Sequence, residues 1–434
     1  MVIVETEKEF VEFHKQFHKH NSVVIPVQCD ENKHPMDTKL CLLYIKILDG
    51  DLKEFVLPFR HTDAINLDPD KYIDMVWSPK DKFTYDKKKL LHFFDWERVN
   101  DVQMNYYLEK NQPLLIDDII THAHEHFYRT YYKKPNINCI IPMMKHIEYC
   151  RKLVDILKVA ALGDKETDAV FKTYNFDVLE NLNKIESNGL QTTDGMVYSE
   201  YNPYTATGRP SNRFGGMNFA ALNKSDGSRK KFVSRYGKDG MLVEMDYDAY
   251  HLRLIADAID YEFPKGSVHE HMAKLYGVDY NEAKSLSFQY LYGHIPDDVI
   301  KSNPFFAKVQ LYIDRVWKGY KLKNFIESDI YSKRIYKKNL SDMNKNKVFN
   351  YLIQLMETES NMSMLTELLP EIEGYKSKLI LYSYDSFLFD FHLKDGIDFL
   401  NKVKGIIEQK GKFPVKVGKG WNYHEMEDIT ENFK

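Results

Sequence analysis

Cysteine is scarce in this sequence of 434 residues. The four cysteines are too few and too scattered for a disulfide framework or a zinc module, so we expect them to be reduced and buried. They are Cys29, Cys41, Cys139 and Cys150. No apolar run approaches the length of a membrane span, so no membrane partner is expected. The N-terminal residues lack the basic start and apolar core of a signal peptide, which predicts an intracellular protein.

An excess of basic charge is also missing. The chain has 60 lysines and arginines against 64 acidic residues, a net charge of −4. This balance excludes indiscriminate coating of nucleic acid, but it leaves room for an enzyme that holds DNA locally in a basic groove. A hydrophobic content of 43% and a charged content of 29% are typical of a globular protein, and the length suffices for two or three domains.

The stretch 241–256 places an acidic residue where a strand gives way to a helix. Residues 241–245 are apolar enough for a buried strand, and the apolar spacing from Tyr250 onward predicts a helix. Asp246 lies between them. A carboxylate at the end of a rigid strand suits a metal ligand. The alternative is that Asp246 only caps the helix by accepting hydrogen bonds from its first N–H groups.

A second acidic residue occupies a comparable position in residues 378–391. This segment predicts two short apolar strands with Tyr384 and Asp385 at the bend between them. If Asp246 and Asp385 meet on one sheet, they can hold two divalent cations on a triphosphate. Phosphoryl and nucleotidyl transfer need this arrangement, because the cations activate the attacking oxygen and stabilise the leaving group.

Four segments, in order along the chain, resemble conserved segments of the family A DNA polymerases, the DNA polymerase I-like enzymes. Residues 205–211 (TATGRPS) are similar to the family's TATGR segment, and 246–253 to motif A. Residues 284–293 resemble the fingers helix, in which Lys is followed at fixed spacing by Phe and Tyr-Gly. Residues 384–386 resemble motif C. The resemblance covers residues 180–434 well and the remainder loosely.

This resemblance implies an α+β multidomain fold shaped like a right hand, of the compact phage type. An antiparallel palm sheet and helical fingers would occupy residues 201–434, with the fingers at about 264–344. Residues 114–200 would form a reduced, helical thumb. Residues 1–113 would form a small exonuclease-like α/β domain, because strands are predicted at 23–29, 40–48 and 54–59 and helices at 87–94 and 102–108.

Exonuclease chemistry requires a cluster of carboxylates. The expected Asp-x-Glu is absent from the first strand, where Asp30 and Glu31 are the nearest acids, while Asp86 or Asp101 can stand for a later one. We therefore expect an inactive domain. Farther along, His122 and His126 share a face of a predicted helix and can bind a metal, although a solvated or partner-facing surface is the favoured reading.

The resemblance also assigns roles to single residues. Two Mg²⁺ ions would be held by Asp246, Asp385 and the carbonyl of Tyr247. Lys284 is the expected catalytic cation and would balance the triphosphate charge with His269. Phe288 and Tyr292 would select and stack on the incoming base. His251 stands where the family has a Glu that blocks the 2′-hydroxyl, and its size predicts selection of deoxynucleotides.

Five residues are expected to contact DNA: Arg209, Asn218, Arg229, Asn350 and Gln354. Each of three has a plainer alternative. Arg209 can serve a structural ion pair, and Arg229 can belong to a solvated basic turn. Gln354 can be a buried amide that satisfies backbone groups.

The chain departs from the family pattern in two places. The Arg that precedes the fingers Lys by one turn is Tyr280 here, so either Lys274, His269 or Lys301 substitutes for it or nucleotide affinity is weak. The Glu of motif C is Ser386, a variant that the related single-subunit RNA polymerases show.

The expected function is template-directed DNA synthesis, in which dNTPs extend a primer 3′-hydroxyl on a primer-template. The alternatives are a single-subunit RNA polymerase and an inactive, polymerase-like DNA-binding accessory protein. A small thumb predicts low processivity unless a processivity or replisome partner compensates. If the chain is phage-encoded, it would act in the host cytoplasm.

Overall fold

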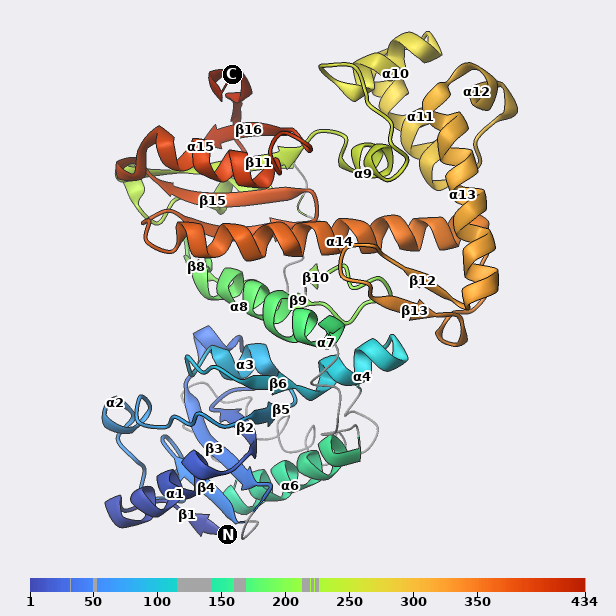
Figure 1. Cartoon of the computed structure of the whole chain (residues 1–434). Coiled ribbons are helices and arrows are strands. Elements are labelled where there is room, and N and C mark those ends of the chain that lie inside the picture. The colour runs from blue at the N-terminus through green and yellow to red at the C-terminus, as the bar shows by residue number, and fades with distance from the viewer. Residues whose placement is uncertain are drawn as a thin grey trace. The chain divides into compact units, whose positions relative to one another are not determined.

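The computed structural model describes residues 1–31, 33–49, 53–114, 142–159, 169–212, 219, 222 and 226–433. The chain divides into two compact units, Met1–Asn183 and Lys184–Lys434 (Figure 1). Asn218 and the histidines at 122–126 lie outside the described residues. Within the described part, no helix is long and apolar enough to cross a membrane. Cys41 and Cys150 are buried, as predicted, whereas Cys29 is half-buried and Cys139 lies outside the described residues.

The first unit is built on a six-stranded sheet in the order β1-β4-β3-β2-β5-β6. Strands β2, β3 and β4 are antiparallel neighbours, and β5 and β6 run parallel to β2. The three predicted strands are confirmed to within two residues. The strands are β1 (Val2–Ile3), β2 (Ser22–Gln28), β3 (Leu40–Ile47), β4 (Glu54–Pro58), β5 (Lys82–Thr84) and β6 (Val99–Asp101).

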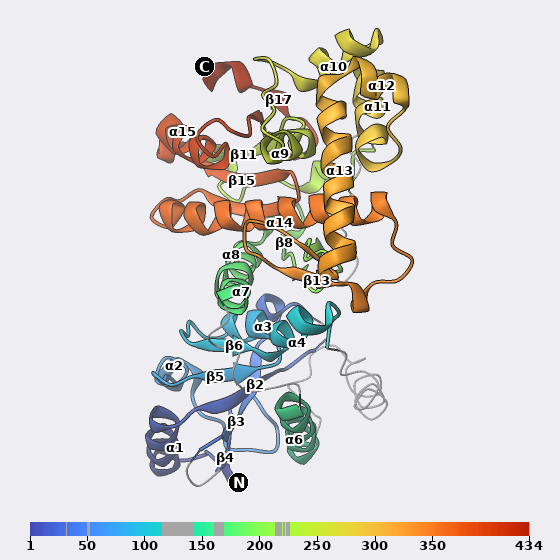
Figure 2. The same cartoon turned by 45° about the vertical axis from the view of Figure 1, so that its right-hand side comes forward.

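Helices cover both faces of this sheet. Helix α1 (Glu7–Lys19) packs Phe10, Phe13 and Phe17 on one face, and α6 (Met143–Val159) packs on the other (Figure 2). Consecutive strand residues such as Val23 and Val24 enter opposite cores, as the two-residue period of a strand requires. The predicted α/β layering is therefore present. The other helices are α2 (Pro69–Tyr72), α3 (Lys87–Leu91), α4 (Val102–Lys110) and α7 (Ala169–Thr173).

A five-stranded sheet, β14-β15-β11-β16-β17, organises the second unit, and each neighbouring pair is antiparallel. This is the antiparallel sheet that the sequence predicts. Its strands are β11 (Gly240–Tyr247), β14 (Lys378–Ser383), β15 (Ser386–His392), β16 (Val415–Gly420) and β17 (Glu427–Asp428). Helix α14 (Lys345–Ile372) contacts both α9 (Tyr250–Ala258) and α15 (Gly396–Ile407).

Helices follow one another between α9 and α14, across the segment predicted to form the fingers. They are α10 (Val268–Tyr276), α11 (Tyr280–Tyr292), α12 (Asp297–Ser302) and α13 (Pro304–Lys323). Ser267 caps α10 and Asp279 caps α11, so the start of each helix is fixed by its own sequence. A short hairpin of β12 (Phe325–Glu327) and β13 (Arg334–Tyr336) leads to α14.

Helix α8 (Leu179–Asn188) and four short strands precede this sheet. The strands are β7 (Leu190–Thr192), β8 (Gly195–Val197), β9 (Tyr201–Asn202) and β10 (Ser211–Asn212). Residues 142–159, predicted to belong to a thumb, contribute to a core of the first unit. The division into three domains at 113 and 200 stays a prediction.

Candidate active site

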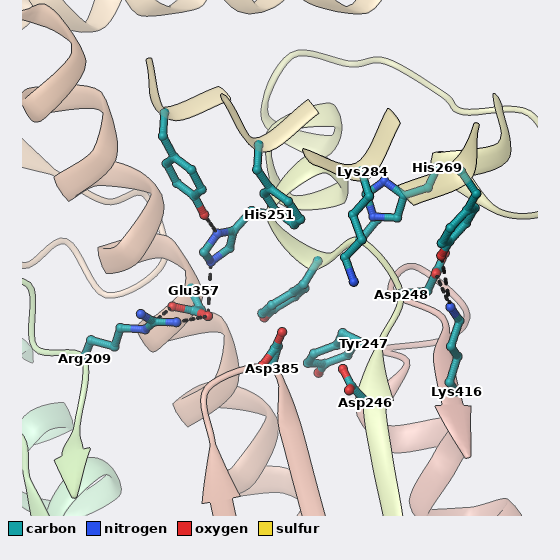
Figure 3. Close-up of a pocket in the computed structure, with 15 residues that line it drawn as sticks. Arg209, Asp246, Tyr247, Asp248, His251, His269, Lys284, Glu357, Asp385 and Lys416 are labelled. Atoms are coloured by element: carbon teal, nitrogen blue, oxygen red, sulfur yellow. Dashed lines mark hydrogen bonds and ion pairs between the residues drawn. The ribbon is translucent and has the colours of Figure 1, made fainter. Parts of the chain in front are cut away.

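The two predicted carboxylates lie at the same end of the second unit's sheet. Asp246 pairs with Ser386 across β11 and β15, and the Tyr247 N–H donates to the Asp385 carbonyl over 2.9 Å. Both acids line a pocket of about 310 Å³ (Figure 3). The prediction that Asp246 and Asp385 meet on one sheet is confirmed.

Local backbone geometry places both side chains. Tyr384 has φ of +62°, which makes the tight bend between β14 and β15 and turns the chain at Asp385. The N-cap residue of α9 is Ala249, with φ of 55°. Asp246 is therefore not the N-cap residue of α9.

Helix α14 holds the bend between β14 and β15 through hydrogen bonds. The amide of Asn361, which is fully buried, donates to the Tyr384 carbonyl over 2.6 Å and to the Tyr382 hydroxyl over 3.0 Å. Its Oδ1 accepts from the Tyr250 hydroxyl of α9 over 2.9 Å. One buried amide thus joins the segments that carry the two acids.

Nine predicted residues line the pocket: Arg209, Asp246, Tyr247, His251, His269, Lys284, Phe288, Tyr292 and Asp385. Six residues that the sequence did not assign to the site line it too: Asp248, Ala249, Tyr250, Tyr280, Glu357 and Lys416. The remaining described predictions, Arg229, Asn350 and Gln354, do not line it.

Helix α11 forms the wall opposite the carboxylates. Lys284, Phe288 and Tyr292 share its inner face, as their four-residue spacing predicts. The Phe288 and Tyr292 rings are nearly parallel, with an interplanar angle of 7° and centroids 6.1 Å apart. His269 of α10 lies against Phe288, and burial lowers its pKa to about 4. At neutral pH it is therefore a hydrogen-bonding group, and positive charge comes from lysine and arginine.

A buried ion-pair network closes one side of the pocket. Glu357 of α14 is 1% exposed, and its carboxylate lies 2.7 Å from Arg209 Nε and 3.1 Å from His251 Nε2. The other nitrogen of His251 contacts the Tyr292 hydroxyl. Burial opposes ionisation of Glu357, but His251 and Arg209 outweigh it and lower its pKa, so the carboxylate stays charged.

The same network acts on Asp385. Burial, and next the charge of Glu357, raise the pKa of Asp385. A cation bound close to Asp385 would lower this pKa again, because it stabilises the ionised form of the carboxyl group. Arg209 forms the structural ion pair of the plainer alternative and also lines the pocket, with its guanidinium 3.7 Å from the centre of the Tyr384 ring, whereas its contact with DNA stays a prediction.

The other predicted DNA contacts have partners within the chain. Arg229 is 8% exposed, donates to the Leu222 carbonyl and stacks 4.3 Å above Tyr423, so the solvated-turn alternative is wrong. Asn350 donates to the Tyr292 carbonyl over 3.2 Å at the end of α11. Gln354 accepts from the Thr207 hydroxyl over 3.2 Å.

A carboxylate also reaches Ser386, where the family pattern has a Glu. Ser386 Oγ donates to Glu244 Oε1 over 2.9 Å, and the Tyr423 hydroxyl donates to the same oxygen over 2.7 Å. Glu244 precedes Asp246 by two residues on β11 and so shares its face of the sheet. Glu244 therefore contacts Ser386 from the neighbouring strand, and it is not among the pocket-lining residues.

Not all of the residues expected to substitute for the missing fingers arginine lie at the pocket. Of Lys274, His269 and Lys301, only His269 is among the pocket-lining residues. Lys416 of β16, which no sequence motif indicated, also lines the pocket.

The acidic residues near the first unit's strand ends have structural partners. Asp86 caps α3 by accepting from Lys89 N, and Asp101 accepts from Lys87 N and Met104 N. Glu31 forms an ion pair with Lys89. Hydrogen bonds and this ion pair account for all three acids.

No family model matches the sequence, and no curated protein matches it. The structure is similar to a solved structure of the POL domain of Pol1 from M. smegmatis, in a complex with DNA primer-template and dNTP. The two are 13% identical, with a TM-score of 0.72, over 98% of this chain and 99% of the other. At this identity the likeness establishes the fold, so the chain has the mixed α+β fold of a polymerase domain.

Proposed function

We propose that this chain is a template-directed DNA polymerase of the family A type that extends a primer 3′-hydroxyl with dNTPs. The observation that carries the proposal is the meeting of Asp246 and Asp385 opposite the Lys284, Phe288 and Tyr292 face of α11. The M. smegmatis structure, whose fold is similar, contains DNA primer-template and dNTP, which supports the same ligands here.

The donor set fits divalent cations that prefer oxygen ligands. Asp246, Asp385 and the Tyr247 carbonyl would hold two Mg²⁺ ions, since carboxylate and carbonyl oxygens suit this cation. Bound Mg²⁺ would supply activation of the primer oxygen and stabilisation of the leaving pyrophosphate. The raised pKa of Asp385 supports this assignment, because a cation would stabilise its charged form.

The chain's own residues bind and orient the nucleotide. Lys284 faces the carboxylates and would balance triphosphate charge, while the parallel rings of Phe288 and Tyr292 offer a stacking surface for the base. His251 is held by Glu357 and Tyr292, so its ring is fixed where the sugar would lie. A fixed, bulky side chain excludes a 2′-hydroxyl.

Arg209 would contact the primer end, and Asn350, Gln354, Arg229 and Asn218 would contact DNA. The partners of Asn350 and Gln354 tie them to α11 and to the segment that contains Arg209. The first unit would be an exonuclease-like domain without activity, because Asp86 and Asp101 cap helices and Glu31 pairs with Lys89. A phage origin and a replisome partner remain part of the proposal.

Ser386 favours one alternative, a single-subunit RNA polymerase. The position of His251 argues against it, because the ring would meet the 2′-hydroxyl of a ribonucleotide. An inactive accessory protein would have no need for Asp246, Asp385 and Lys284 to face one pocket.

A primer-extension assay with Mg²⁺ tests the proposal. We expect the wild-type chain to extend with dNTPs, and Asp246→Asn or Asp385→Asn to abolish extension, because each removes a metal-binding charge. Duplex binding and the melting temperature should change little. Asp257→Asn is the matched control, since Asp257 pairs with Lys412 outside the pocket. Extension that survives both substitutions, or that runs equally fast with ribonucleotides, would contradict the proposal.

A further inference from the structure

The pocket has two chemically different sides. Figure 3 shows Arg209, Glu357 and His251 on one side of Asp385, and His269, Asp248 and Lys416 on the other. The first side holds the ring of His251 in its ion-pair network. The second side carries a lysine that no sequence motif predicted.

Register places Lys416 beside the catalytic strand. It lies directly opposite Asp246 in the pairing of β16 with β11, so both side chains leave the same face of the sheet. Its Nζ lies 3.3 Å from Asp248 Oδ1 and 3.5 Å from the Tyr280 hydroxyl of α11. Lys416 therefore spans from the sheet to the start of the helix that carries Lys284.

The ammonium group is charged and accessible. The Lys416 side chain is 53% exposed. Burial lowers its pKa, but Asp248 and Tyr280 outweigh this, and the net pKa is raised. Asp248 also pairs with Arg253 over 3.2 Å, so this carboxylate keeps a cation when Lys416 binds another anion.

We propose that Lys416 binds the terminal phosphates of the incoming nucleotide and supplies the positive charge that α11 lacks at Tyr280. The inference rests on the proposed function and adds a specific triphosphate-binding residue to it. Three observations carry it: the shared pocket with Lys284, the contact with Tyr280, and the second partner of Asp248.

The competing explanation is that Lys416 only neutralises Asp248. The two explanations predict different effects on the binding of nucleotides with three phosphates and with one. A residue that binds terminal phosphates contributes to triphosphate binding and little to monophosphate binding. A residue that only neutralises Asp248 weakens the binding of both nucleotides when it is lost, in proportion to their charges, so that dAMP affinity also falls measurably.

Two measurements on the full chain test the proposal. The first is the KM for dNTP in single-nucleotide primer extension, and the second is the equilibrium affinity for dATP and for dAMP in the presence of Ca²⁺. For Lys416→Met we expect the KM and the dATP dissociation constant to rise about tenfold or more, from loss of one charge-assisted contact. The dAMP affinity should change less than about twofold, and Lys416→Arg should restore most of the dATP affinity.

Lys419→Met is the matched control. Lys419 lies on the same strand, pairs with Glu427 and is absent from the pocket lining, so the same loss of charge should leave both measurements unchanged. A fall in dAMP affinity of more than about twofold alongside the fall in dATP affinity, or no loss of either, in Lys416→Met would overturn the proposal. If the wild-type chain fails to extend primers yet shows the dATP-specific loss, the proposed function fails and this assignment stands.

Discussion

Glu357 shows at the scale of single residues how a buried charge can set the shape of a pocket. Its carboxylate is shared by Arg209 and His251, and His251 in turn contacts Tyr292. Burying the Glu357 carboxylate costs desolvation, which its contacts with Arg209 and His251 offset. The residue thus positions the groups proposed to meet the primer end and the sugar.

Glu357→Gln tests this positioning role. We expect the discrimination between dNTP and rNTP to fall about tenfold, because His251 loses its charged anchor, and the free energy of unfolding to fall by about 1–3 kcal/mol. Competition assays and chemical denaturation measure the two effects. Glu371→Gln is the control, since Glu371 lies on α14 and pairs with Lys402. Unchanged sugar selectivity in Glu357→Gln would show that His251 is held by other contacts.

At the scale of helices and strands, strand register and helix capping determine which side chains become neighbours. The pairing of β11 with β15 brings Glu244 to Ser386, and that of β11 with β16 brings Lys416 opposite Asp246. A shift of one residue in either pairing would send these side chains to the other face. In the first unit, capping determines the environment of Asp101, which is fully buried at the start of α4.

Asp101 gives a pH prediction. Burial, followed by Asp86, raises its pKa to about 7, above its value in the unfolded chain. Between about pH 4 and 7 the folded chain therefore binds a proton that the unfolded chain has lost, and stability falls as the pH rises through this window. We expect Asp101→Asn to flatten this fall in plots of unfolding free energy against pH. Parallel curves for the two proteins would contradict the assignment.

Charge is unevenly distributed at the scale of the whole molecule. The chain carries a net charge of −4, yet residues 301–347 contain twelve lysines and arginines and four acids. This basic segment covers the end of α12, α13, the β12–β13 hairpin and the start of α14. Lys321 and Lys338 are exposed within it. A local surplus of this kind attracts nucleic acid even when the whole chain is acidic.

DNA affinity should therefore depend steeply on salt. We expect the logarithm of the association constant for primer-template to fall linearly with the logarithm of salt concentration. Replacing Lys321 and Lys338 together with Gln should reduce the slope by about two, if each lysine neutralises one phosphate. Fluorescence anisotropy at several salt concentrations measures this. An unchanged slope would place the phosphate contacts on other residues.

The sequence by itself determined the elements and the central residues of the candidate site. Periodicity predicted the strands that flank Asp246 and Asp385, and spacing predicted the shared face of Lys284, Phe288 and Tyr292. These features are local, because they depend on residues within one or two turns or strands.

Tertiary structure alone decided the charges that surround those residues. Glu357 enters from a long helix and Lys416 from a strand near the end of the chain, and neither has a local pattern that marks it. The tertiary structure also decided that Ala249 is the N-cap residue of α9 and that Glu244 accepts a hydrogen bond from Ser386. The physical reason is that electrostatic partners are chosen by distance in space, which sheet register and helix packing set.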